Sequence, residues 1–292
     1  PDQAITFNVV NYVNSTKATS GVKYENGTFG TYALLVAQGK SFDDTEVTDN
    51  TLIKFMDNVP VGLNGNTWVP GTLSGTTFTP ALYYWPKEAT LTFASYSPYK
   101  AESAPVYTKA NGWAITNYTV TGDEDLMLTD TIAKDCNSER NADGTEITDN
   151  ANPESAYKGV PTLFNHKLSK IGFSFKTLAN TYKAASSVSS WTIKLTKASV
   201  VYAAKIADYL NNAWSFASHS YAAETFGEFS YVSSDQTLSE SASTEVFHYL
   251  MPQDLTKTYT DENSATFTPS LHLEYTITTN YTGYDNPVVE TV

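Results

Sequence analysis

Apolar and polar residues alternate with a period of two in segments spread over the whole chain. At the start, Ile5, Phe7 and Val9 are separated by Thr6 and Asn8. Successive side chains of a β-strand point to opposite faces, so this pattern predicts a strand with one buried face. The same alternation is found in four later segments: residues 91–93, 171–175, 191–195 and 271–277. We therefore expect half-buried strands from one end of the chain to the other.

Turn-forming sequences separate these segments, among them Asn26-Gly27, residues 62–65 (GLNG) and Pro70-Gly71. Gly and Asn tolerate positive φ and Pro fixes φ, so such clusters reverse the chain. Short strands with frequent turns are typical of β-sandwiches. The aromatic content of 13% also suits pleated, half-buried surfaces. An all-β fold is predicted, with residues 203–210 (AAKIADYL) as either one helical turn or an irregular strand.

The length of 292 residues exceeds the usual size of one hydrophobic core. Residues 135–157 are polar, acidic and almost free of large apolar side chains, so they cannot form a core. We place a domain boundary at the end of this polar linker. The prediction is two tandem β-sandwich domains, one over residues 1–155 and one over residues 156–292.

Charge and composition exclude several classes of function. The net charge of −13 argues against nucleic acid as a partner, because binding to phosphates needs clustered Lys and Arg. No apolar run approaches the ~18 residues of a membrane span.

The lone Cys136 lies among polar residues and is interpreted as incidental. A chain that opens at Pro1 suits a mature form whose export signal has been removed.

Four segments, in this order, resemble the fimbrillin-like family of Bacteroidales, the subunits of type V pili. They are residues 84–99 (YWPKEATLTFASYSPY), 125–130 (DLMLTD), 160–175 (VPTLFNHKLSKIGFSF) and 250–255 (LMPQDL). The resemblance implies two sandwiches of transthyretin-like topology in a non-enzymatic pilus subunit. It also implies export as a lipoprotein precursor to the outer membrane and cell surface, where a lipid anchor is the only membrane contact. Expected partners are other pilus subunits, joined by β-strand exchange, and a host or bacterial surface glycan or protein.

The resemblance also implies proteolytic trimming near Lys17, which lies in residues 14–20 (NSTKATS). Relatives usually carry Arg before Ala-Thr, where a trypsin-like protease is thought to cut. Lys keeps the positive charge but loses the planar guanidinium. The alternative is that Lys17 is only a solvated loop residue. If the cut occurs, the strand with Ile5, Phe7 and Val9 is the displaced strand.

The donor of a replacement strand is left open by the sequence. Residues 287–292 (PVVETV) make a poor strand, and the aromatic-rich closing strand expected of many relatives is missing. A tip subunit, an anchor subunit and a trimmed chain are therefore alternatives to a stalk subunit.

Four single residues have a structural and a functional interpretation. Trp85 suits a core position better than a sugar-stacking platform, because a strand with Leu91 and Phe93 follows it. His166 shares its alternation with apolar residues and is expected to be a neutral core histidine. His272 falls on a polar face, and the Gln253 amide is expected to cap loop backbone groups.

No catalytic, cofactor-binding or metal-binding residue is predicted. The four histidines lack zinc spacing, and no nucleophile elbow occurs. Residues 139–150 match an EF-hand loop in the middle but fail at Glu139 and Asn150, the first and last positions. The acidic run Asp123, Glu124 and Asp125 is expected to be solvated.

Two rivals to the pilus subunit stay open. A carbohydrate-binding surface module is supported by the abundant Tyr and Trp residues. A β-sandwich glycoside hydrolase would need two carboxylates across a cleft, which sequence spacing cannot test.

Overall fold

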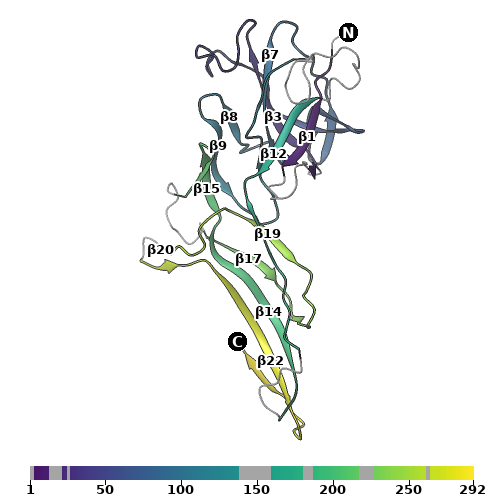
Figure 1. Ribbon diagram of the computed structural model, residues 1–292, viewed down its shortest axis with the longest axis vertical. Helices are drawn as coiled ribbons and strands as arrows, with labels where there is room; N and C mark the ends of the chain where they lie inside the picture. Colours follow the sequence, from purple (N-terminus) through teal and green to yellow (C-terminus); the bar gives the residue numbers. More distant parts are fainter. Residues whose placement is uncertain are drawn as a thin grey trace. The chain divides into compact units, whose positions relative to one another are not determined.

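The computed structural model describes residues 3–12, 22–24, 27–137, 159–179, 187–216, 226–260 and 264–292. Strands, turns and irregular segments make up these residues, which confirms the all-β prediction (Figure 1). No helix among them is long and apolar enough to cross a membrane. The chain forms two compact units, each made of several segments of the sequence.

Unit 1 contains Pro1–Thr116, Asp125–Lys167 and Tyr209–Ala213. Its described residues form a ten-stranded sheet in the order β2-β1-β12-β10-β7-β3-β4-β5-β6, with β11 on β7. These strands are β1 (Phe7–Tyr12), β2 (Val22–Lys23), β3 (Phe29–Val36), β4 (Ile53–Asn64), β5 (Thr67–Ser74), β6 (Thr77–Pro80), β7 (Thr90–Ser97), β10 (Met127–Leu128), β11 (Ala133–Cys136) and β12 (Val160–His166). The hairpin of β8 (Val106–Thr108) and β9 (Gly112–Thr119) also begins in this unit.

The sheet of unit 1 folds over a large apolar core. Phe7 of β1 pairs with Trp68 of β5, so strands far apart in the sheet order meet. The core lies between them and is rich in aromatic rings, which bury the most apolar area per residue. Its buried members include Tyr24, Phe29, Met56, Val61, Trp85, Leu91, Phe93, Met127, Val160 and Phe164.

Unit 2 contains Asn117–Glu124, Leu168–Asp208 and Trp214–Val292. Its described strands form a five-stranded sheet in the order β17-β14-β22-β23, with β18 on β14, and two-stranded sheets β13-β19 and β20-β21. The strands are β13 (Ser169–Phe173), β14 (Val188–Ala204), β17 (Phe226–Val232), β18 (Gln236–Thr237), β19 (Val246–Leu250), β20 (Tyr259–Thr260), β21 (Thr266–Phe267), β22 (Ser270–Tyr281) and β23 (Val288–Thr291). The long β14 and β22 pair along most of their length.

The chain passes between the units at more places than the boundary at residue 155 implies. β12 follows that position but pairs with β1, so this part of the chain reaches unit 2 only at Leu168. β9, β15 (Ile206–Leu210) and β16 (Ala213–Ser215) each begin in one unit and end in the other. Residues 203–210 form strand rather than helix, because Ala207 and Tyr209 are buried with a period of two.

Cys136, which was interpreted as incidental, has surroundings that its polar sequence neighbours do not indicate. It ends β11, pairs with Leu91 of β7 and is buried in the core of unit 1. A thiol behaves as a small hydrophobic group, so it can occupy such a position although its sequence neighbours are polar.

Candidate functional site

β1 is paired along both of its edges, and Figure 1 shows it beside β12. On one side it runs parallel to β12, from Phe7 opposite Val160 to Tyr12 opposite Asn165. On the other side it pairs with β2 and, through Phe7, with β5. The backbone just before it is also held, because Ile5 N donates to the Tyr83 carbonyl over 2.7 Å. Removing β1 would therefore leave unpaired backbone groups on its neighbours, chiefly along β12.

Ile5, Phe7 and Val9, the predicted face of the displaced strand, all point into the core. Their exposed fractions are 1%, 3% and 7%. The Phe7 ring makes edge-to-face contacts with Phe29 and Phe93, with centroids 5.6 and 5.7 Å apart. Burying three such side chains stabilises the fold by about 5 to 9 kcal/mol, at ~1.5 to 3 each. Without β1, the core of unit 1 would open as an apolar groove.

Gly159 allows β1 to approach the start of β12, a role that the sequence analysis missed. Its φ is +98°, a conformation that residues with a side chain rarely adopt. A Cβ there would lie 2.7 Å from the carbonyl carbon of Phe7 and 3.0 Å from Asn8 N. The available signal was a lone glycine directly before the apolar strand that begins at Val160.

Lys17, the predicted processing residue, lies outside the described residues. Its place in the sequence is in the connection between the end of β1 at Tyr12 and the start of β2 at Val22. β2 pairs antiparallel with β1. A cut in this connection would break the covalent link between β1 and the rest of the chain. β2 would stay part of the larger fragment.

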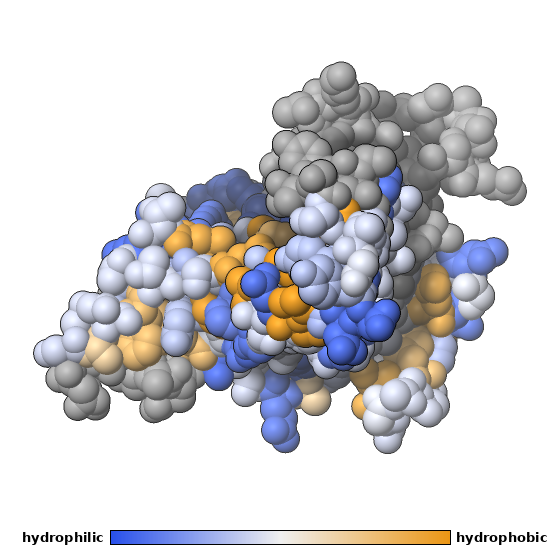
Figure 2. Space-filling model, turned by 90° about the horizontal axis from the view of Figure 1, so that it is seen from below, coloured by the Kyte–Doolittle hydropathy of each residue, from blue (hydrophilic) through white to orange (hydrophobic). Residues whose placement is uncertain are grey.

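The closing residues form an exposed strand. β23 pairs with β22, and Val292 and Tyr275 exchange backbone hydrogen bonds of 2.8 and 2.9 Å. Val288, Val289 and Val292 are all about half exposed. Leu271 and Leu273 of β22 are exposed as well, although their segment was expected to be half-buried. Figure 2 shows hydrophobic residues at the surface in separate patches between hydrophilic ones.

His166 was expected to be a neutral core residue, and this was wrong. It is exposed at the end of β12, while its Nδ1 makes a short contact with the buried Asp125 carboxylate. The strand ends at His166, so the ring can leave the apolar face and pair with a charge. Asp125 was expected to be solvated together with Asp123 and Glu124, and this expectation was also wrong for Asp125.

Three other single-residue predictions are confirmed. Trp85 is buried and packs edge-on against Phe93, with centroids 5.8 Å apart. The Gln253 amide bonds to backbone groups, since Oε1 accepts from Ala204 N over 2.8 Å and Nε2 donates to the Ala204 carbonyl over 3.0 Å. His272 is exposed and lies 3.1 Å from a Glu274 carboxylate oxygen.

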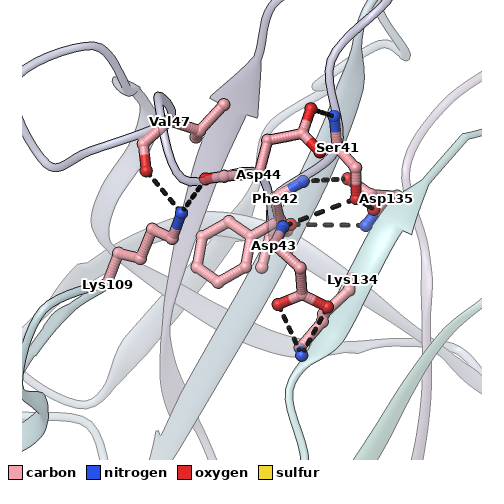
Figure 3. A network of polar contacts seen from close by, with 9 residues as sticks. Ser41, Phe42, Asp43, Asp44, Val47, Lys109, Lys134 and Asp135 are labelled. Carbon is pink, nitrogen blue, oxygen red and sulfur yellow. Dashed lines mark hydrogen bonds and ion pairs between the residues drawn. The ribbon is translucent and has the colours of Figure 1, made fainter.

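A polar network anchors residues 41–49 in unit 1 (Figure 3). The Lys109 ammonium donates to the carbonyls of Asp44, over 2.7 Å, and Val47. The Asp135 carboxylate accepts from Ser41 Oγ over 2.7 Å and from the Phe42 amide over 3.0 Å. These contacts fix the conformation of an acidic loop, mainly through its backbone. The network is therefore structural and gives no reason to propose a ligand for the loop.

Metal-ligating groups do not gather in the described part of the chain, where no three His, Cys, Asp or Glu residues come close enough to share an ion. The EF-hand-like residues 139–150 lie outside that part. The prediction that they bind no calcium stays a prediction.

Comparison with known proteins adds a likeness in structure. No family model and no curated protein matches the chain. A solved structure from Bacteroides uniformis, described as a "putative cell adhesion protein", aligns with 99% of this chain and 84% of its own, at 14% identity and a TM-score of 0.38. The function of the chain has to be inferred from its own geometry.

Proposed function

We propose that the chain is a structural, non-catalytic subunit of a cell-surface pilus that exchanges β1 for a strand of a neighbouring subunit. The observation that supports this most is the position of β1. It is the first strand, it contributes the buried side chains of Phe7 and Val9, the buried Ile5 comes directly before it, and a connection that contains Lys17 follows it. Trimming there would free the strand that occupies the groove.

Strand exchange follows from what loss of β1 would expose. The edge of β12 would have unpaired N–H and C=O groups, and the core would lose the side chains of Ile5, Phe7 and Val9. An extended segment with apolar residues at every second position satisfies both needs at once. The partner is therefore another subunit of the same pilus, in keeping with the fimbrillin-like sequence segments and with export as a lipoprotein to the cell surface.

Limited trypsin treatment tests the first step. We expect cleavage after Lys17 before most other basic sites, because connections rich in small polar residues are preferred nicking points. The Lys17→Gln variant is the matched control and should resist this first cut. Trimmed protein should then bind a hydrophobic dye and form oligomers that resist SDS.

A peptide with the sequence of residues 3–12 tests the groove itself. Added to trimmed protein from which the released strand has been removed, it should bind and suppress both dye binding and oligomer formation. The same peptide with Phe7→Asp should not bind, since it would place a charge in the core. A trimmed protein that stays monomeric, equally stable and free of bound dye would rule out strand exchange.

A further inference from the structure

Tyr202 lies in a β-bulge of β14. The register with β17 shifts between Val201 and Ala203, which leaves Tyr202 as the extra residue. Its φ is +60°, a region that bulky residues normally avoid. Bulges commonly redirect a side chain, and this side chain is 44% exposed although Tyr is suited to burial. A strained backbone thus presents an aromatic ring to solvent.

The Tyr202 ring continues a row of aromatic rings in unit 2. It lies 5.3 Å from Phe267 of β21, which stacks on Phe226 of β17 at 5.3 Å, and Phe226 contacts Tyr259 of β20. Phe226 and Tyr259 are buried, and Phe226 supports the Phe267 ring against which Tyr202 packs. Four strands contribute to this aromatic wall, which is buried at Phe226 and Tyr259 and exposed at Tyr202.

This wall borders a pocket of about 200 Å³, lined by Val201, Tyr202, Phe226, Gly227, Glu228 and Phe267. We call it the aromatic pocket. The Glu228 carboxylate lies 2.9 Å from the Lys197 ammonium, and the hydrogen bond from Lys197 lowers its pKa. One lining residue, Glu228, therefore carries an ionised carboxylate whose charge is already balanced.

We infer that the aromatic pocket binds one neutral pyranose unit of a glycan. A pyranose ring has an apolar face of C–H groups, which the electron-rich face of an aromatic ring attracts, and hydroxyls that donate to a carboxylate. A volume of this size suits one ring rather than a drug-sized ligand. An ammonium ligand is disfavoured because Lys197 already pairs with Glu228. This inference does not depend on strand exchange, since the pocket lies wholly in unit 2.

Saturation-transfer NMR tests the site with methyl pyranosides of glucose, galactose, mannose, N-acetylglucosamine and fucose. Each pyranoside is added at about 10 mM, a concentration at which weak binding is still detected. At least one pyranoside should give a signal with the wild-type protein. Tyr202→Gly should weaken it about fivefold or more, because it removes the stacking ring. Gly adopts positive φ freely, so this variant should melt no lower than the wild type.

Two further variants distinguish the site from its surroundings. Tyr284→Ala, at a tyrosine of the same unit that is 77% exposed, should bind as the wild type does. Glu228→Gln keeps the shape of the side chain and should weaken binding with the fold intact. The proposal is overturned if no pyranoside binds, if Tyr202→Gly binds as the wild type does, or if tetramethylammonium displaces the bound pyranoside.

Discussion

The backbone of β1 passes so close to Gly159 that an added methyl group would collide with it. We expect Gly159→Ala to lower the free energy of unfolding of unit 1 by about 3 kcal/mol. The positive φ contributes ~1 to 2 kcal/mol of this and the collision the rest. Urea denaturation followed by tryptophan fluorescence measures the loss.

Gly39→Ala is the matched control for this substitution. Its φ is +75° and its Cβ would meet nothing within 4 Å, so only the conformational part of the loss, ~1 to 2 kcal/mol, should appear. Equal losses of unfolding free energy for the two variants would show that the backbone of β1 imposes no steric limit at Gly159.

The pair of His166 and Asp125 gives a second residue-level prediction. His166→Ala should destabilise unit 1 by about 1 to 2 kcal/mol, because it removes a hydrogen bond from a buried carboxylate. Asp125→Asn should reduce the effect of a subsequent His166→Ala, and a double-mutant cycle by chemical denaturation measures this coupling. Strictly additive losses would contradict the pairing.

Single residues were predictable where one face of a strand decided their surroundings. His272 of β22 is of this kind, whereas Trp85 and Gln253 lie outside the strands and were predictable from the segments next to them in the sequence. His166 and Asp125 were misjudged, and the burial of Cys136 was not foreseen, because their surroundings come from strands distant in sequence, which periodicity does not identify. Gly159 was missed for the same reason, since its constraint is the backbone of β1.

Lys109 should contribute more to the stability of the loop between β3 and β4 than the surface ion pairs of this loop do. Lys109→Met keeps the length of the side chain but removes the donor to the carbonyls of Asp44 and Val47. We expect a loss of about 1 to 3 kcal/mol in chemical denaturation. The control Lys134→Met breaks only an exposed pair with Asp43, so it should lose less than ~1 kcal/mol. A larger loss at Lys134 would contradict this ranking.

Strands were predictable from alternation, but their partners and irregularities were not. The segments around Phe7, Phe93, Phe173, Ile193 and Leu273 are strands as expected. The parallel pairing of β1 with β12 joins residues from opposite sides of the polar linker, and no local pattern encodes it. The bulge at Tyr202 likewise depends on the register with β17.

At the scale of the whole molecule, two units were expected from length and two compact units are present. Their limits could not be read from composition, because the polar residues 135–157 lie inside the range of unit 1. The chain crosses between the units through β9, β15 and β16, whose sequences look like any other short strand. Composition shows where no core can form, but it does not show which strands share one.

Hydrogen exchange followed by mass spectrometry can separate the two units during assembly. Trimming and removal of β1 should speed exchange in peptides that cover residues 160–166, because the amides of β12 lose a strand partner. Peptides that cover residues 188–204 should keep their protection, since the strands that pair with β14 in the described part of the chain, β17, β18 and β22, all belong to unit 2. In the SDS-resistant oligomer, β12 should regain protection, because a strand from a neighbour would bond to the same amides. Oligomers whose β12 amides still exchange fast would mean that subunits associate in another way, and the proposal of strand exchange would have to be given up.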